Sequence, residues 1–491
     1  MFAEHGRYRR AAILVGSAMV LASLALNLGG QRTEARRLGA AAPVTLSVYT
    51  CCGSLSGFND PNPRDLGSIH HMYGGMLAEK FPSVRWRETT FADPATLESR
   101  LIAAVAAGTP PDMAFVQGDY AGYTVLRNLA LPLDQYYAAA AVKNAAFLPG
   151  MARWAHFGGH WWAIPAVSGP MGGQQLYLPE YLAPLGYNNQ NLRTFSDFFQ
   201  MSKKAVRFNA ASVLTRIGYW PGTDSWETIG TLMCPVGHGL YNAADQPTAT
   251  DPCNVAYLGY LKKLADLYGG YRGLQKFLAA DPDFLGGNPS AYLATGKAIL
   301  PQSGYAYWNA PPLDAFSFGV KGGLQYQLTP MPVTVNGTLA EAANYPTTQQ
   351  EIIVPRGAKH PDLAFAVSKL MFWDHGNVLG WAASGSPVVK DQSTWLTQFF
   401  AGEAATRKQA GLPGNPIASL EAVKLQPKLG LLSKQSNPIN PVDLYYQTTL
   451  AQATEQVLLG KQSPLAALQG VQKQVLAEEQ RLKSQYGAWN W

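Results

Sequence analysis

The chain has 491 residues and a formal net charge of +6, with 47% apolar and only 14% charged residues. This length favours two lobes over one simple core, and the apolar content excludes a disordered chain. The basic residues are spread along the sequence, so no dense cluster indicates a nucleic-acid or polyphosphate site. The low charge favours a neutral ligand.

Residues 1–42 predict an export signal or an N-terminal membrane anchor. A basic run from Arg7 to Arg10 precedes an uncharged apolar stretch at 11–30, and this order is typical of export, with the basic side kept in the cytoplasm. Cleavage after Ala25 or within the Ala-rich 39–42 would release the protein. Without cleavage, about 20 residues just span a hydrocarbon core of about 30 Å. Both outcomes place the mature chain outside the cytoplasm.

The first part of the mature chain predicts an α/β unit with a parallel sheet. Short β-branched and apolar runs at 44–50, 84–90 and 113–116 favour strands, and periodic segments at 66–81 and 94–107 favour helices between them. Gly108 and the two prolines at 110–111 end the second helix. Strands that alternate with helices in this way are typical of right-handed parallel crossovers.

The remaining chain predicts helices at 192–208, 256–268 and 464–485 and strand pieces at 298–301, 325–332 and 351–354. The segment from 396 onward is expected to be mostly helical. No repeat and no long Gly/Ser or Pro linker separates these parts. We therefore expect two lobes joined by crossing strands rather than by a flexible tether.

The four cysteines are compatible with an exported protein. Cys234 and Cys253 bracket a short Gly-rich segment and are expected to form a disulfide across it. Cys51 and Cys52 are adjacent, and a bond between neighbours strains the peptide. We therefore favour the interpretation that Cys51 and Cys52 are two partly buried thiols, with a vicinal disulfide as the alternative.

Six stretches of the sequence occur in a familiar order. They are AVAAGTPPD at 104–112, GGHWWAIP at 158–165, the segment from GHG at 237–239 through Asp251-Pro252, YLATGKAILPQSGYAYWN at 292–309, PRGAKHPDLAFAVSKLMFW at 355–373, and LGKQSPLAAL at 459–468. In this order the chain resembles the extracellular family 1 sugar-binding proteins of ABC importers, the group typified by maltose-binding protein. The longer loop around Cys51-Cys52 and the lack of a lipidation cysteine after 11–30 depart from many members.

The resemblance implies a two-lobed periplasmic-binding-protein-like α/β fold of type II, with discontinuous lobes. The first lobe would comprise 44–165 plus 333–375, and the second 168–328 plus 376–491. Crossing strands are then expected near 164–168, 328–333 and 373–377.

The resemblance also implies where a sugar would be held, since sugars stack on aromatic rings and pair their hydroxyls with polar groups. Asp119, with Gln117 as a weaker companion, follows the strand at 113–116, although Asp119 could instead cap the next helix. Core packing is the alternative for every aromatic residue. The expected ligand contacts are Asp119, Gln117, Trp226, Asp224, Trp308, Tyr305, Tyr307, Trp162, Trp381 and Tyr446, the last interchangeable with Tyr445.

No sequence motif indicates catalysis, a cofactor or a metal. His156 and His160 have the spacing of a helical metal pair, but Gly158-Gly159 between them argues against a helix. The expected function is that of a monomeric receptor that captures a sugar and delivers it to the permease subunits of an ABC importer, with no nucleic-acid partner. An exported glycan-active enzyme and a surface sensor or adhesion module on the same fold remain the alternatives.

Overall fold

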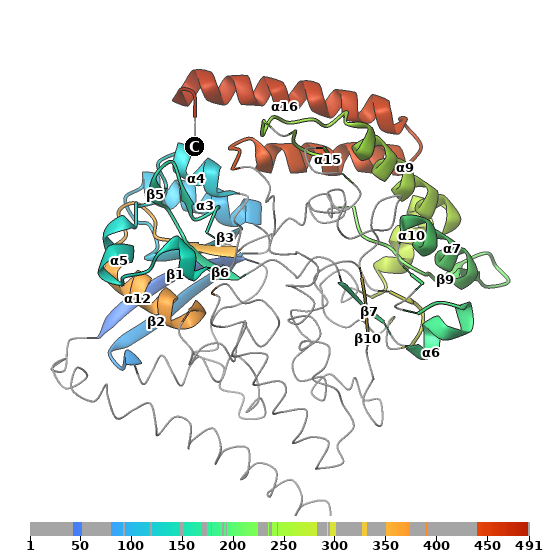
Figure 1. Ribbon diagram of the computed structural model, residues 1–491, viewed down its shortest axis with the longest axis horizontal. Coiled ribbons are helices and arrows are strands. Elements are labelled where there is room, and N and C mark those ends of the chain that lie inside the picture. Colours follow the sequence, from blue (N-terminus) through green and yellow to red (C-terminus); the bar gives the residue numbers. More distant parts are fainter. Residues whose placement is uncertain are drawn as a thin grey trace, which may run out of the picture.

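The computed structural model describes residues 43–51, 80–91, 94–117, 120–147, 152–167, 174–177, 179–188, 191–192, 194–223, 234, 238–242, 244–281, 292, 295–300, 327–330, 350–373, 389 and 439–489. These residues form two groups of elements, seen at the left and right of Figure 1. Two separate clusters of buried residues lie inside them. The first core cluster draws on 46–166 and 352–373, and the second on 182–300 and 442–475.

A five-stranded sheet forms the centre of the first group. Its order is β2-β1-β3-β11-β6. β1 pairs in parallel with β2 and β3, whereas β11 runs antiparallel to both β3 and β6. The strands are β1 (Val44–Cys51), β2 (Val84–Phe91), β3 (Met113–Gln117), β6 (Ile164–Val167) and β11 (Gln350–Ile353). The expected strands at 44–50, 84–90, 113–116 and 351–354 are confirmed.

Helices pack on this sheet around the first core cluster. α3 (Pro94–Ala106) buries Leu97 and Leu101 and ends before Gly108, whose φ is +69°, as the sequence predicts. The other elements here are α4 (Ala121–Leu126), α5 (Asp134–Ala139), the 3-10 helix Asn144–Ala146, the hairpin β4 (His156–Phe157) with β5 (His160–Trp161), and α12 (Pro361–Phe372). Apart from Lys80 and Phe81, the helix expected at 66–81 lies outside the described residues.

A buried aspartate joins distant parts of the chain. Asp112, 3% exposed, accepts hydrogen bonds from the backbone N and the Oγ of Ser47, both at 2.7 Å, and from the backbone N of His360 at 3.0 Å. One carboxylate therefore fixes β1, the start of β3 and the start of α12 relative to one another.

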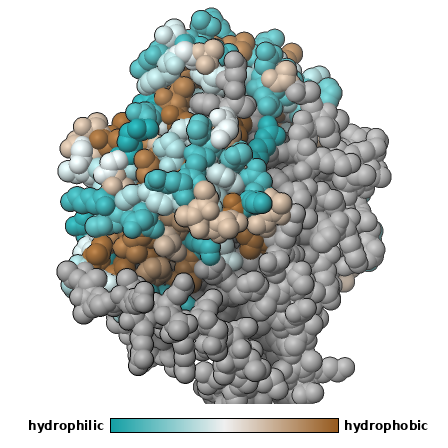
Figure 2. Space-filling model, turned by 60° about the vertical axis from the view of Figure 1, so that its left-hand side comes forward, coloured by the Kyte–Doolittle hydropathy of each residue, from teal (hydrophilic) through white to brown (hydrophobic). Residues whose placement is uncertain are grey.

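Figure 2 shows the first group of elements from outside, with hydrophilic residues spread over its described surface and hydrophobic ones in smaller patches.

The second group is mainly helical. It contains α6 (Pro179–Leu182), the 3-10 helix Ala183–Leu185, α7 (Phe195–Ala205), the hairpin β8 (Arg207–Phe208) with β9 (Leu214–Arg216), α9 (Pro252–Leu267), α10 (Tyr271–Leu278), α15 (Asp443–Leu458) and α16 (Pro464–Tyr486). Its core is rich in tyrosine. Among the described helices, none combines the length and apolar character needed to cross a membrane.

Some expected boundaries in this group were wrong. The helix predicted at 192–208 begins after Thr194, which forms a capping box with Asp197, and ends at Val206 because the backbone there turns extended. The helix predicted at 256–268 starts four residues earlier, because Asp251 caps it. The piece at 298–301 forms only an isolated bridge between Ala298 and Ile217.

Two chain passages connect the groups. β6 in the large sheet is followed by β7 (Gln174–Tyr177), and β7 pairs antiparallel with β10 (Gln327–Pro330), which precedes β11 along the chain. The chain thus leaves the large sheet after β6 and returns to it at β11, beside the strand that it left.

The C-terminal helices also reach the first group. In Figure 1, α16 runs across the top of the molecule, from above α9 to above α4. A Cβ added to Gly122 of α4 would lie 3.0 Å from Ile439, just before α15. The guanidinium of Arg153 lies 3.3 Å from the carboxylate of Asp245, between the two groups. The groups therefore touch at their upper side as well as through the connecting strands.

Candidate ligand-binding site

The carboxyl ends of four strands meet at one edge of the large sheet. Because β11 is antiparallel to β3 and β6, its first residue, Gln350, pairs with both Gln117 and Val167, the last residues of those strands. Cys51 and Phe91 end β1 and β2 at the same edge. Open α/β sheets bind ligands outside the carboxyl ends of their strands. The chain also departs for the second group from this edge, which makes it the best candidate for a ligand site.

A small pocket lies behind Gln117. It is lined by residues of β1, β3, α3 and α4 and has room for little more than a water molecule. Its exposed walls are apolar, although the buried Glu98 and Thr124 are among the residues that line it. The Oγ1 of Thr124 donates to the backbone O of Ala121 at 2.8 Å. Gln117, the last residue of β3, is half-buried and is one of the residues that line this pocket.

The adjacent tryptophans at β5 have different environments. Trp161 is buried and stacks on Tyr137, with ring centroids 3.8 Å apart. Trp162 is half-buried, and its Nε1 donates to the backbone O of Phe157 at 3.1 Å. Trp161 is therefore a core residue. The ligand contact expected of Trp162 stays a prediction.

Tyr446 lies in the second core cluster, which differs from the cleft position that we expected. Its side chain is fully buried and packs edge-on against Tyr241, with ring centroids 5.6 Å apart. Burial, followed by the nearby Asp443 and Asp251, raises the pKa of its hydroxyl well above the ordinary value. Because α15 turns this residue inward, Tyr445 is the exposed member of the pair, at 39%.

The other expected contacts lie outside the described residues. They are Asp119, Asp224, Trp226, Tyr305, Tyr307, Trp308 and Trp381. Of the expected set, Gln117 is at the sheet edge, Trp162 is on the hairpin before β6, and Tyr446 is in the other core. The sequence had not indicated Gln350, whose pairing with Gln117 depends on a strand that returns from far along the chain.

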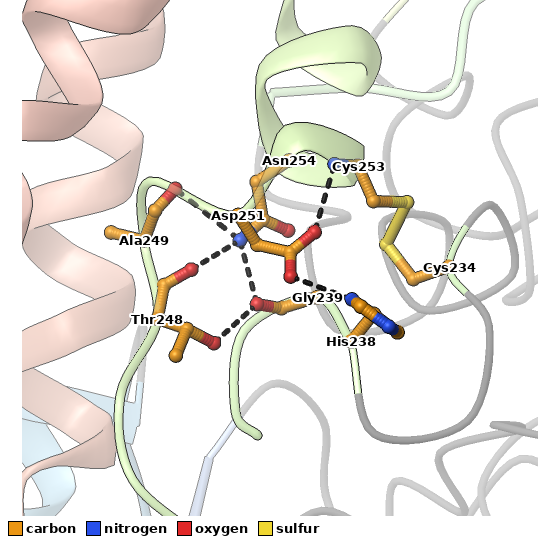
Figure 3. The surroundings of a disulfide bond; sticks show 8 residues. All are labelled: Cys234, His238, Gly239, Thr248, Ala249, Asp251, Cys253 and Asn254. Carbon is orange, nitrogen blue, oxygen red and sulfur yellow. Dashed lines mark hydrogen bonds and ion pairs between the residues drawn. A yellow bond between two sulfur atoms is a disulfide. The ribbon is translucent and has the colours of Figure 1, made fainter.

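The expected disulfide between Cys234 and Cys253 is present, with Cα atoms 5.5 Å apart. Figure 3 shows that it joins the loop before α9 to the first turn of that helix. Asp251 caps the same turn by accepting from the backbone N of Cys253 at 2.8 Å, and its other carboxylate oxygen lies 3.0 Å from Nδ1 of His238. Asn254 donates to three backbone carbonyls of the loop, those of Gly239, Thr248 and Ala249.

Removal of this disulfide is expected to lower the free energy of unfolding by about 3 kcal/mol, because the bond closes a loop of 19 residues in the unfolded chain. The double variant Cys234→Ser, Cys253→Ser would show this in urea denaturation. Wild-type protein kept in a reductant should match the variant. A loss below about 1 kcal/mol would contradict this prediction. It would mean that the loop is already restricted in the unfolded chain without the disulfide.

His156 and His160 are not arranged as a metal-binding pair. His156 and His160 lie on the β4–β5 hairpin, whose turn contains Gly158 and Gly159 at positive φ, so they do not share a helix face. Nδ1 of His160 lies 3.0 Å from the carboxylate of Asp134. Within the part of the chain that the structure describes, no group of three His, Cys, Asp or Glu side chains is placed to hold a metal ion.

No protein-family model matches the chain, and no curated protein sequence matches it. Solved structures do match its fold. A binding protein associated with an ABC transporter of B. animalis subsp. lactis Bl-04, in complex with beta-1,6-galactobiose, has a TM-score of 0.66 at 14% identity, over 90% of this chain and 98% of the other. An ABC substrate-binding protein from Listeria monocytogenes, in complex with cycloalternan, has a TM-score of 0.63 at 14% identity, over 88% and 98%.

A maltotriose-binding protein from Thermus thermophilus has a TM-score of 0.61 at 13% identity, over 88% of this chain and 99% of the other. At such low identity the likeness concerns the fold, and it extends over nearly the full length of each neighbour. Together with the sheet order and the two passages between the groups, it confirms the expected type II architecture. The chain has the two-lobed α/β fold of the sugar-binding proteins of ABC transporters.

Proposed function

We propose that this protein is an extracytoplasmic solute-binding protein that captures a sugar or oligosaccharide between two lobes and delivers it to an ABC importer. The observation that carries this proposal is the five-stranded sheet whose carboxyl edge faces both passages to the second group. Structural neighbours with this fold were solved in complex with beta-1,6-galactobiose, with cycloalternan and with maltotriose.

The proposed lobes are 44–165 plus 333–375 and 168–328 plus 376–491. The composition of the two core clusters supports this division, because the first includes residues from 46–166 and 352–373 and the second includes the C-terminal helices. The β6–β7 and β10–β11 connections would act as hinges. The third crossing proposed near 373–377 follows α12, which ends beside β6, where Nε1 of Trp373 donates to the backbone O of Pro165 at 2.7 Å.

Ligand binding would shift the lobes from an open to a closed arrangement. A ligand can do this only if it makes contacts in the closed form that it lacks in the open form, so residues of both lobes must touch it. In this proposal Asp119 and Gln117 contribute polar groups from the first lobe. Trp162 is the proposed aromatic contact at the hinge, and the second lobe supplies Asp224, Trp226, Tyr305, Tyr307, Trp308 and Trp381.

The proposed setting follows from the N-terminus. Residues 1–42 would export the chain or anchor it to the outer face of the cytoplasmic membrane, where the permease subunits of an importer are its partners. The protein would act as a monomer and without catalysis, since a receptor must return its ligand unchanged.

A screen of neutral mono- and oligosaccharides by thermal shift tests this function. A sugar at 100 times its Kd is expected to add about 2.7 kcal/mol to the free energy of unfolding. Trp226→Ala should abolish the sugar-dependent shift, whereas Tyr486→Ala, which alters a tyrosine 37% exposed at the end of α16, should leave it unchanged. Product analysis after incubation separates the alternatives: cleaved sugar would establish an enzyme, and no shift with any saccharide would overturn sugar capture.

A further inference from the structure

Two arginines face each other on a short hairpin of the second group. β8 and β9 are antiparallel, and Arg207 pairs with Arg216 in their register. Side chains directly opposite in such a pair have Cβ atoms about 5 Å apart, and like charges there destabilise the hairpin. On the other side of β9, Ile217 bridges Ala298, and its backbone N donates to the O of Lys297 at 2.8 Å. Arg207, Arg216 and Lys297 therefore lie on three neighbouring backbone segments, with the Nζ of Lys297 5.1 Å from the centre of the Tyr292 ring.

The described residues provide no carboxylate to neutralise this cluster. Nη1 of Arg207 donates to the backbone O of Lys204 at 2.6 Å and of Val206 at 2.7 Å, both at the end of α7. Nε of Arg216 is buried without a hydrogen-bond partner. Burial, and after it the charge of Arg207, lowers the pKa of Arg216. Arg207 is exposed and Arg216 is half-buried, so the cost of this pair is the repulsion of like charges placed opposite each other, and a bound anion would relieve that repulsion.

A tyrosine lies on the same side of the fold. Tyr181 of α6 is close enough to Arg216 to act on the pKa of its guanidinium in the opposite direction to Arg207. Its ring packs against the backbone at Gly296, where an added Cβ would lie 2.8 Å from the ring. Among the described residues, the neighbouring Glu180 makes no ion pair with either arginine. The two guanidinium groups are suitable donors for an oxyanion.

The same hairpin exposes two apolar side chains. Phe208, next to Arg207, is 42% exposed, and Val213, just before β9, is 48% exposed. The ring of Phe208 rests over Gly269, where an added Cβ would lie 3.2 Å from it. Exposed apolar residues beside cations are a combination that suits the head group and upper acyl region of an anionic lipid. A free oxyanion would use the cations alone.

We propose that Arg207, Arg216 and Lys297 form a binding site for a phosphate group, carried by inorganic phosphate or by the head group of an anionic phospholipid. Guanidinium groups recognise phosphate through paired, charge-assisted hydrogen bonds. The site belongs to the second group, beside α6 and α7 at the right of Figure 1, whereas the sugar site is proposed at the edge of the large sheet. The two sites are independent, and neither requires the other.

Phosphorus NMR of the full-length protein in a neutral detergent tests the site. One arm titrates inorganic phosphate, and the other titrates short-chain phosphatidylglycerol in the same detergent, with phosphatidylcholine as the uncharged comparison. Arg216→Gln is expected to weaken binding at least tenfold, since a hydrogen bond between charged groups is worth that much. Arg216→Lys, which keeps the charge but loses the forked donors, should weaken it less.

Matched variants separate this site from general charge effects. Arg272→Gln removes an exposed cation from α10 in the same group and should leave the affinity unchanged. If the phosphate group belongs to a lipid, Phe208→Ser should reduce binding of phosphatidylglycerol but not of inorganic phosphate. If the ligand is free phosphate, Phe208→Ser should reduce the binding of neither probe. The proposal is overturned if neither probe binds, or if Arg216→Gln and Arg272→Gln weaken binding equally. The sugar-dependent thermal shift of Arg216→Gln should match that of the wild type, so the two proposals fail separately.

Discussion

Raising the pH above about 10 is expected to unfold this protein cooperatively, because its cores contain several fully buried tyrosines. Burial raises the pKa of Tyr268 from 10.0 to about 12, and that of Tyr137, Tyr219 and Tyr260 well above the ordinary value. A tyrosine in the unfolded chain ionises near pH 10. The folded chain therefore keeps protons that the unfolded chain releases, so the stability held by these groups is complete below about pH 10 and declines as the pH rises toward 12.

The size of the effect is large for a protein of ordinary stability. A pKa shift of about two units, as for Tyr268, corresponds to about 3 kcal/mol. The pKa values of Tyr137, Tyr219 and Tyr260 shift in the same direction, and a typical domain has a free energy of unfolding of only about 5–15 kcal/mol. Tyrosinate absorbance and helical circular dichroism should therefore change together over one narrow pH interval. A gradual rise of absorbance with unchanged circular dichroism would contradict this.

A matched pair of variants isolates one contributor. The hydroxyl of Tyr260 is buried without a hydrogen-bond partner, so Tyr260→Phe removes an ionisable group without breaking a described bond. This variant should unfold at a higher pH than the wild type and be no less stable at neutral pH. Tyr486→Phe, at an exposed position, should leave the alkaline midpoint where it is.

Gly218→Val is expected to lower the free energy of unfolding by more than about 3 kcal/mol. A Cβ at Gly218 would lie 2.5 Å from both the Cα and the Oγ of Ser202, which is fully buried in α7. This close approach brings Oγ of Ser202 within 3.1 Å of the backbone N of Tyr219, from which it accepts a hydrogen bond. Since the nearest atom belongs to a helix backbone, the new side chain would push α7 away and break that bond.

Gly259→Ala provides the control for this substitution. Gly259 lies within α9, and a Cβ there meets nothing within 4 Å. Alanine should stabilise the helix by about 0.5–1 kcal/mol because it costs less conformational entropy. Urea denaturation of both variants checks the pair. A loss below about 1 kcal/mol for Gly218→Val would show that α7 can move aside without cost.

Local signals in the sequence predict much of the secondary structure. The start of α3 at Pro94 and its end before Gly108 follow from residue types whose backbone preferences are strong. The end of α7 is different. The apolar residues Val206 and Phe208 continue the helical pattern beyond Ala205, but Val206 ends the helix and Phe208 pairs with Leu214 of β9 in a hairpin. Periodicity cannot predict this change, because β8 is only two residues long.

The candidate site was predictable only in part. The rule that ligands lie beyond strand ends located Gln117, because β3 is a short apolar run with clear limits. Gln350 and the Arg207–Arg216 pair depend on which strands become neighbours, and a single sequence carries no direct signal of that. Tyr446 and Tyr445 are adjacent on a helix, so a shift of one position exchanges a core residue for a surface residue.

The position of β11 constrains when this protein can fold. Within the part of the chain that the structure describes, β6 joins the large sheet by pairing with β11, which begins at residue 350, and Asp112 accepts a hydrogen bond from the backbone of His360. A ribosome must therefore make roughly three quarters of the polypeptide before the first lobe can close its sheet. A nascent chain that stays incomplete for so long remains unfolded, which fits the export that we propose for this protein.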